Sequence, residues 1–182
     1  KTKMGLNLET IKAFKLGYSP DKPQVLKNFL VDKKGYQIAE IERAGLGILR
    51  DARIIDRFAG RIIFPLFDHR GNVTGFAGRL LPINEKSNLA KYINSPETPV
   101  YHKGSLLYAL NETRSLIKEK NQVIVVEGEL DAISSWQAGV DNVVATKGSA
   151  LTQDQIRLLS RFTKEVVLAM DADMAGDAAA RR

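Results

Sequence analysis

The last third of the chain alternates between continuous apolar runs and helical spacing. Three short apolar runs predict buried strands at residues 123–126, 143–146 and 166–170. Between them, residues 130–138 and 152–162 have apolar side chains at helical spacing, and a further helix is expected from Gly176. Thr152 begins a Thr-Gln-Asp-Gln pattern that is typical of a helix N-cap. Strands that alternate with helices predict a parallel sheet with crossover helices on its faces.

The first 120 residues show a more varied pattern. Apolar residues at helical spacing predict short helices over 8–16 and 25–31 and around Ile38 and Ile41, then a longer amphipathic helix over 106–120. β-branched and aromatic residues predict a hairpin, with strands 62–67 and 73–81 joined by the turn 68–72 and followed by a loop over 82–90. We therefore expect an α/β protein, with a mixed α/β segment over 1–120 and a parallel sheet with flanking helices over 121–182.

Composition narrows the class of protein. The sequence has no apolar run of eighteen residues, which argues against a membrane span. It also has no cysteine, which excludes disulfides and thiolate metal sites within these residues and fits a cytoplasmic location. Its two histidines, His69 and His102, lack the cysteine partners that would suggest zinc.

Charge is divided unevenly along the chain, whose net charge is +6. Residues 1–120 carry 21 basic and 12 acidic side chains, whereas residues 121–182 carry 6 basic and 9 acidic ones. A basic segment beside an acidic one suggests a surface for a polyanion next to a cation site. An uneven distribution of solvated surface charge is an equally good explanation of the charge pattern alone.

Acidic residues directly follow two of the predicted strands. Glu127 comes after strand 123–126, and Asp171 and Asp173 come after strand 166–170. Ligands of open parallel α/β sheets bind at the carboxyl ends of the strands, so neighbouring strands would bring these three carboxylates together. Carboxylates at short range repel one another unless a cation lies among them, and Mg²⁺ prefers such oxygen ligands. The sequence therefore predicts a Mg²⁺ site, in which Mn²⁺ can substitute.

Each acid taken alone also fits a helix N-cap or a first-turn position that the helix dipole favours. The two motifs together, at two strand ends, favour the metal site. The Glu127-Gly128 pair and the segment from Asp171 through Asp173 to Gly176 resemble a Toprim domain. This resemblance implies Mg²⁺-dependent phosphodiester chemistry, but primases, topoisomerases and some nucleases share the fold.

Motifs in the basic segment select among these classes. They are Asp-Arg-Phe-Ala-Gly-Arg at 56–61, Gly-Phe-Ala-Gly-Arg at 75–79, Lys-Tyr-Ile-Asn-Ser-Pro-Glu-Thr at 91–98 and Tyr-His-Lys-Gly at 101–104. In this order, just before a Toprim segment, they resemble the catalytic core of DnaG-type bacterial primases over essentially the whole chain. The resemblance implies synthesis of RNA primers on single-stranded DNA from ribonucleoside triphosphates, at the bacterial replication fork.

The same resemblance assigns roles to individual residues. Glu127 and Asp171 are expected to hold one Mg²⁺, which activates the attacking 3′-hydroxyl, and Asp171 and Asp173 a second, which binds the triphosphate. Phosphate and nucleotide contacts are expected from a basic ridge with adjacent polar residues, namely Arg79, Lys91, Tyr92, Asn94 and Lys103, with Arg57 and Arg61 as weaker members. Tyr92 is also compatible with core packing.

Two departures from the family pattern concern the acidic motifs. The family usually has Tyr-Met after the Glu-Gly pair, where this chain has Glu129-Leu130, so an extra charge lies near the metal site. It usually has Gly between the two aspartates, where this chain has Ala172. A further acidic motif, an N-terminal zinc-binding domain and a C-terminal domain that binds the replicative helicase are expected outside these residues, so the chain is interpreted as a C-terminally truncated core.

Two other functions remain open from the sequence. A Toprim nuclease or topoisomerase module would use the same acids to cleave DNA, although the motif at 91–98 then has no explanation. A non-catalytic DNA-binding module would use the acids only as helix caps. The expected partners in the preferred interpretation are single-stranded DNA, ribonucleoside triphosphates and the RNA–DNA product, with no membrane partner.

Overall fold

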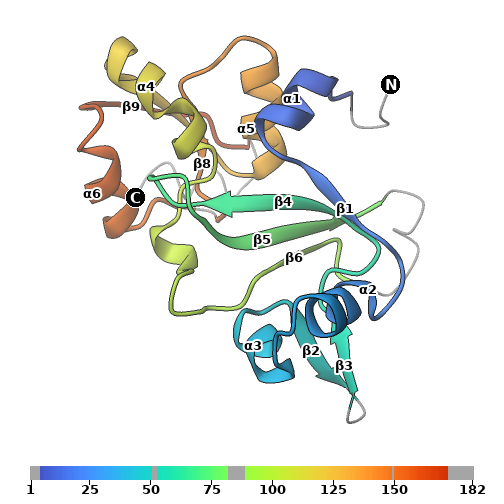
Figure 1. Ribbon diagram of the computed structural model, residues 1–182. Coiled ribbons are helices and arrows are strands. Elements are labelled where there is room, and N and C mark those ends of the chain that lie inside the picture. Colours follow the sequence, from blue (N-terminus) through green and yellow to red (C-terminus); the bar gives the residue numbers. More distant parts are fainter. Residues whose placement is uncertain (1–4, 51–52, 82–88, 149, 172–182) are drawn as a thin grey trace. The chain divides into compact units, whose positions relative to one another are not determined.

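A computed structural model describes residues 5–50, 53–81, 89–148 and 150–171 (Figure 1). The chain divides into two compact units, each made of segments that are not contiguous in sequence. The parallel-sheet unit comprises residues Lys1–Phe14, Phe67–Val73 and His102–Arg182. The antiparallel-sheet unit comprises residues Lys15–Leu66 and Thr74–Tyr101.

The parallel-sheet unit is built on three strands, β7 (Gln122–Val126), β8 (Val143–Ala145) and β9 (Glu165–Leu168). Their order is β8-β7-β9 and both pairs are parallel, so β7 is the central strand. Val123 and Val125 are fully buried on β7, as is all of β8. The predicted parallel sheet is confirmed, and the strands that carry Glu127 and Asp171 at their carboxyl ends are neighbours.

Helices cover both faces of this sheet. The connection from β7 to β8 through α5 (Glu129–Gln137) and the return to β9 through α6 (Gln153–Leu159) run in opposite directions across the sheet. Because such crossovers are right-handed, α5 and α6 lie on opposite faces (Figure 1). Helix α4 (Leu110–Lys120) shares an apolar core with α6. Helix α1 (Leu8–Ala13) is followed by its C-cap Phe14, whose ring packs edge-on against Trp136 of α5.

The predicted helix over 106–120 begins later than expected, at Leu110. The backbone of Tyr108 instead pairs with Ala145 at the edge of β8, through N–H···O bonds of 2.9 and 3.0 Å. Ala109 then takes a left-handed conformation, with φ of 68°, which turns the chain into the helix. A sheet contact between residues 37 positions apart overrides the local helical pattern. Leu106 and Leu107 are still buried, and Leu107 belongs to the apolar core of this unit.

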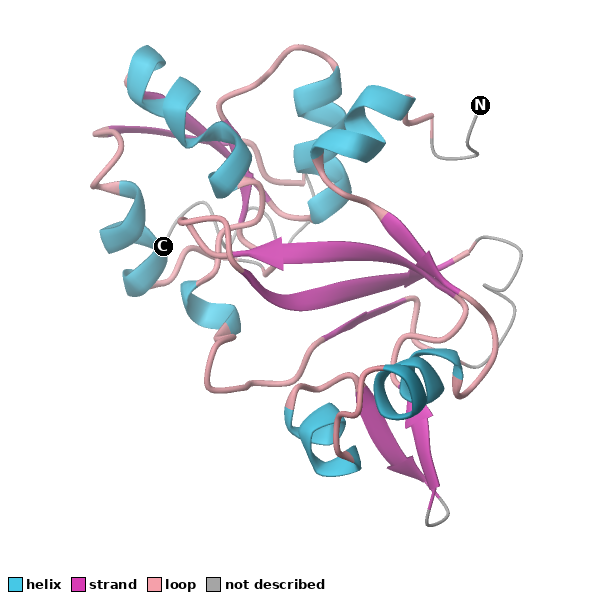
Figure 2. Cartoon of the chain, viewed as in Figure 1, coloured by secondary structure: helices cyan, strands magenta, loops and turns pink. Residues whose placement is uncertain are grey.

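The antiparallel-sheet unit contains a four-stranded sheet in the order β1-β4-β5-β6 (Figure 2). These strands are β1 (Gly17–Ser19), β4 (Arg61–Phe67), β5 (Val73–Leu80) and β6 (Tyr92–Asn94). The predicted hairpin of β4 and β5 is confirmed in this sheet, although the turn that joins the strands belongs to the parallel-sheet unit. Strands β1 and β6, which add to its two sides, were not predicted.

A smaller layer in this unit combines α2 (Val25–Asn28), the π-helical turn η1 (Phe29–Lys33) and α3 (Ile38–Arg43) with a second hairpin. That hairpin, β2 (Gly47–Arg50) with β3 (Arg53–Asp56), was also not predicted. The buried Asp56 carboxylate accepts the N–H groups of Leu26 and Lys27, at 2.7 and 2.8 Å. Asp56 therefore caps the start of α2 across 30 residues of sequence.

The fold as a whole is the mixed α/β architecture that the sequence predicts. The predicted loop over 82–90 lies outside the described residues except for 89 and 90, and the predicted helix from Gly176 lies wholly outside them. No helix in the described part of the chain is long and apolar enough to cross a membrane.

Candidate functional site

Glu127 and Asp171 meet at the carboxyl ends of β7 and β9. The parallel register pairs Val125 with Leu168, and Ala169 extends the ladder by donating to the carbonyl oxygen of Val125 at 2.8 Å. Two residues later, the backbone N–H of Asp171 donates to Oε1 of Glu127 at 3.4 Å. Glu127 is half-buried and Asp171 is exposed, so both carboxylates are open to a ligand.

Two predicted site residues are therefore adjacent, and the third, Asp173, lies outside the described residues. Within the described ranges, no group of three or more His, Cys, Asp or Glu side chains is arranged to hold a metal. The available donors are hard carboxylate oxygens at a sheet edge, and this donor set fits Mg²⁺ or Mn²⁺. The expectation of a complete three-carboxylate cluster stays a prediction.

The turn after β7 is fixed by three hydrogen bonds. The N–H of Gly128 donates to Oδ2 of Asp131 at 3.0 Å, and the N–H of Ala132 donates to the carbonyl of Gly128 at 3.2 Å. The N–H of Lys147, just after β8, donates to the carbonyl of Glu127 at 3.0 Å. Asp131 is thus a helix cap that orients the turn, and sequence reasoning missed this role.

Lys147 and Glu129 form a buried ion pair beside this turn. Each residue is 8% exposed, and Nζ of Lys147 donates to Oε1 of Glu129. Burial lowers the pKa of Lys147, the Glu129 carboxylate works against that effect, and the charge of Lys103 lowers the pKa further. Lys103, a predicted phosphate ligand, is therefore close enough to this region for its charge to act on Lys147.

Lys103 is exposed at the start of the 3₁₀ turn η3 (Lys103–Ser105), in the same compact unit as the two carboxylates. The hydroxyl of Thr152, the N-cap of α6, donates to the carbonyl of Gly104 at 2.5 Å. This bond ties the turn that presents Lys103 to the start of α6.

In the antiparallel-sheet unit, five predicted residues gather around the β5–β6 pair. Arg79 and Tyr92 face each other in the register, and the guanidinium carbon of Arg79 lies 5.3 Å from the centre of the Tyr92 ring. Asn94 pairs with Ala77, and its carbonyl accepts Nε–H of Arg57 at 3.2 Å. Lys91 is exposed, and its carbonyl accepts the N–H of Leu80 at 3.0 Å. Tyr92 is 41% exposed, which favours a surface role over core packing.

Arg61 differs from the other predicted cations because it is 5% exposed. Its guanidinium donates to three carbonyl oxygens, those of Ala90 at 2.8 Å, Lys91 at 3.2 Å and Gly78 at 3.4 Å. Its side chain also crosses Gly78, where an added Cβ would lie 3.0 Å from Cδ of Arg61 and 2.8 Å from the Phe58 ring. These contacts favour a structural role, in which Arg61 holds the segment that carries Lys91 against β5.

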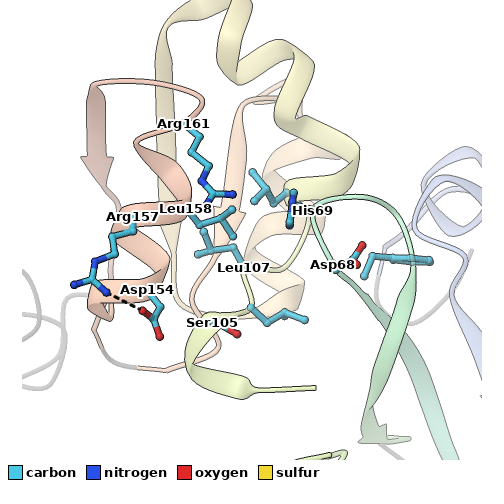
Figure 3. Close-up of a pocket in the computed structure, with 11 residues that line it drawn as sticks. Asp68, His69, Ser105, Leu107, Asp154, Arg157, Leu158 and Arg161 are labelled. Carbon is cyan, nitrogen blue, oxygen red and sulfur yellow. Dashed lines mark hydrogen bonds and ion pairs between the residues drawn. The ribbon is translucent and has the colours of Figure 1, made fainter. Parts of the chain in front are cut away.

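A separate cavity of about 350 Å³ lies in the parallel-sheet unit, between the turn after β4, residues 105–110 and α6 (Figure 3). Leu107 and Leu158 lie in its apolar interior, while Arg161 and His69 point toward it from two sides (Figure 3). Arg157 on its rim is paired with Asp154 at 3.4 Å. None of the predicted site residues lines this cavity.

The chain matches two protein families. Residues 2–114 match the family described as DNA primase catalytic core, N-terminal domain. Residues 124–182 match the family described as Toprim-like. The first match alone covers more than half of the chain.

Curated relatives agree with these families. A DNA primase of Clostridium acetobutylicum is 44% identical over 98% of this chain, and one of Geobacillus stearothermophilus is 41% identical over 97%. The chain spans 29% of the length of each of these relatives.

Solved structures give the same result. The RNA polymerase domain of the Mycobacterium tuberculosis primase DnaG superposes with a TM-score of 0.88 at 32% identity, covering 99% of this chain and 60% of that one. A DnaG primase catalytic domain bound to single-stranded DNA superposes with a TM-score of 0.85 at 37% identity, covering 98% of this chain and 55% of that one. With the family match over most of its length, the chain belongs to the DnaG-type DNA primase catalytic core family.

Proposed function

We propose that this chain is part of a DNA primase that synthesises RNA primers on single-stranded DNA by metal-dependent nucleotidyl transfer. One observation carries the proposal: Glu127 and Asp171, at the ends of adjacent parallel strands, are joined by a hydrogen bond and open to a ligand, within a primase-family chain. The relatives are DNA primases, and one solved neighbour is bound to single-stranded DNA.

The residues at the carboxyl ends of β7 and β9 suit a divalent cation. Glu127, Asp171 and Asp173 would hold two Mg²⁺ ions, and Mn²⁺ would substitute. When bound, the metals supply charge stabilisation at the attacking 3′-hydroxyl and at the departing pyrophosphate. The turn after β7 keeps the Glu127 carboxylate at the strand end, because its backbone is fixed by Lys147 and by the Asp131 cap.

The basic residues would bind phosphate and nucleotide. Arg79, Lys91 and Lys103 supply positive charge for the template backbone and the incoming triphosphate, since charge-assisted contacts to phosphate are strong. Tyr92, with the Arg79 guanidinium over its ring, offers a face on which a base can stack. Arg57 and Asn94 belong to the same set, since the Arg57 guanidinium donates to the carbonyl of Asn94. Arg61 supports the set by holding the Lys91 segment through the Lys91 carbonyl.

The wider roles follow from family membership. We propose residues 1–120 as the basic segment that binds template and nucleotide and residues 121–182 as the Toprim segment that holds metal. The full-length protein would act at the replication fork in the bacterial cytoplasm. It would use ribonucleoside triphosphates, release an RNA–DNA hybrid and bind the replicative helicase through a domain outside these residues.

The experiment incubates the full-length protein with a single-stranded DNA template and labelled ribonucleoside triphosphates, in Mg²⁺ and then in EDTA. The proposal predicts short, template-dependent RNA products in Mg²⁺ and none in EDTA. Shortened DNA instead of RNA would indicate a nuclease. DNA binding with neither product would indicate a non-catalytic module and overturn the proposal.

A further inference from the structure

The Glu129–Lys147 pair brings two opposite charges into the interior of the parallel-sheet unit. The side chain of Lys147 is 1% exposed and that of Glu129 is 10% exposed. Burial of an ion is unfavourable unless another charge or hydrogen bond compensates it, so each member of the pair depends on the other. Helix α5 begins with Glu129, and Lys147 follows β8, so the pair joins two elements that are 18 residues apart.

The backbone of Lys147 is unusual as well. Its φ of 61° lies in the left-handed region, which L-residues with long side chains seldom adopt. In this conformation its N–H reaches the carbonyl of Glu127, while its side chain turns inward to Glu129. Lys147 thus hydrogen-bonds to both ends of segment 127–129. Its backbone N–H binds the carbonyl of Glu127, and its ammonium binds the carboxylate of Glu129.

Glu129 would matter to a metal at this strand end because it is only two residues from Glu127. A carboxylate there, without a counter-charge, adds negative charge and oxygen donors beside the proposed ligands. The Lys147 ammonium offsets that charge and occupies Oε1 of Glu129 with a hydrogen bond. The Lys120–Asp141 pair of the same unit differs because it lies at the surface, with side chains 43% and 33% exposed.

We propose that the Glu129–Lys147 pair is a positioning device for the metal site, which sets the net charge beside Glu127 and reserves metal binding for Glu127 and Asp171. This proposal rests on the proposed function, because it requires the carboxylates to hold a divalent cation. It predicts that the two members of the pair act on metal affinity in opposite directions. A pair that served the fold alone would act in the same direction through both members.

The test measures Mn²⁺ affinity of the full-length protein by electron paramagnetic resonance, without nucleotide or DNA. Glu129→Gln leaves the Lys147 ammonium without the Glu129 carboxylate and should weaken Mn²⁺ binding roughly tenfold, as a nearby unit charge requires. Lys147→Met leaves the Glu129 carboxylate without that ammonium and should tighten Mn²⁺ binding by about the same factor. The double variant Glu129→Gln/Lys147→Met buries neither charge and should return to within about threefold of the unmodified protein.

Controls separate the possible failures. Asp141→Asn and Lys120→Met, at the surface pair, should leave the affinity unchanged. If Lys147→Met does not fold, its effect is read from the double variant compared with Glu129→Gln. Adding Lys147→Met to Glu129→Gln should then restore the lost Mn²⁺ affinity. Both single variants weakening Mn²⁺ binding, or neither changing it, would overturn the pair's role. An unmodified protein that binds no Mn²⁺, or binds it equally after Glu127→Gln, would instead overturn the metal site itself.

Discussion

Arg61 shows how one arginine in a group of predicted phosphate ligands can serve the fold instead. The sequence places it in a motif with Arg57 and suggests a phosphate ligand. In the structure its guanidinium is buried and donates hydrogen bonds to the carbonyls of residues 78, 90 and 91. Burial lowers the pKa of Arg61, but three carbonyl acceptors compensate the loss of water.

Arg61→Ala should therefore destabilise the protein more than loss of a surface arginine does. Three carbonyl oxygens lose a charged donor at once, which predicts a fall of about 2–4 kcal/mol in the free energy of unfolding. Arg53→Ala, at an exposed position on β3, is the matched control and should change this free energy by less than about 0.5 kcal/mol. Urea denaturation measures both, and equal losses would contradict the structural role.

Asp68 stabilises the turn after β4 in a pH-dependent way. Burial works to raise the pKa of Asp68, but hydrogen bonds from Asn72, Arg70 and Gly71 outweigh it and lower the pKa overall. Because the pKa is lower in the folded state, the ionised carboxylate contributes stability above its unfolded value of about 3.9. This contribution is lost as the pH falls through the folded value.

Asp68→Asn tests this linkage. Its loss of unfolding free energy relative to the unmodified protein should be constant above about pH 5 and shrink below about pH 4. Thermal unfolding of both proteins at a series of pH values across this range measures the difference in unfolding free energy. A loss that stayed constant down to the lowest accessible pH would show that the charge of Asp68 does not stabilise the turn.

At the scale of elements, α6 joins the fold of the parallel-sheet unit to the loop that presents Lys103. Thr152 accepts the N–H of Gln155 at 3.1 Å, and Gln155 in turn accepts the N–H of Thr152 at 3.0 Å. The amide of Gln155 also donates to the carbonyls of Leu106 and Thr146, at 2.8 and 3.2 Å. The start of this helix thus fixes both the η3 turn and the end of β8.

Thr152→Ala should remove the cap and the bond to Gly104 together. The loss of a threonine N-cap predicts a fall of about 1–2 kcal/mol in the free energy of unfolding. Hydrogen exchange should also quicken at the amides of η3. Thr152→Ser retains the hydroxyl and serves as the control, so similar destabilisation by both variants would exclude the cap as the cause.

Most elements with a strong local pattern are predictable from this sequence. The β7–α5–β8–α6–β9 alternation, the β4–β5 hairpin and the Thr152 cap follow from periodicity and capping rules. The elements that were missed depend on distant partners. Strands β1 and β6 are three residues long and pair with the central hairpin. Strand β2 begins at Gly47, and in the sequence Gly45 and Gly47 indicate only the end of a helix.

The candidate site was predictable to the same extent. Glu127 and Asp171 follow from their positions at strand ends, and Arg79, Tyr92 and Asn94 are brought together by the β5–β6 register. The link between Glu129 and Lys147 was not predictable from spacing, because 18 residues and a whole crossover separate them. The available signal was Lys147 itself, a charged residue two positions after the apolar strand β8.

At the scale of the whole molecule, the uneven charge predicts how the protein binds DNA. If the basic residues contact phosphates, affinity for single-stranded DNA should fall with salt as counterions are released. Lys91→Ala and Lys103→Ala should each weaken binding and reduce the slope of log affinity against log salt by about 0.7. Lys33→Ala, at an exposed position outside the motifs, should leave the slope unchanged. A salt-independent affinity would contradict the basic surface.

The central claim is that the carboxylates at the ends of β7 and β9 hold the metal ions of primer synthesis. Glu127→Gln and Asp171→Asn in the full-length protein remove one charge each without changing side-chain size. Asp141→Asn removes an acid of the same unit that pairs with Lys120 at the surface.

The most direct measurement is the rate of primer synthesis in Mg²⁺ for these three variants, with folding checked by circular dichroism. We predict that Glu127→Gln and Asp171→Asn each lower the rate by roughly 100-fold or more, because several kcal/mol of transition-state stabilisation is lost. Asp141→Asn should retain the rate of the unmodified protein. Folded Glu127→Gln and Asp171→Asn variants that both retained the full rate would contradict the claim.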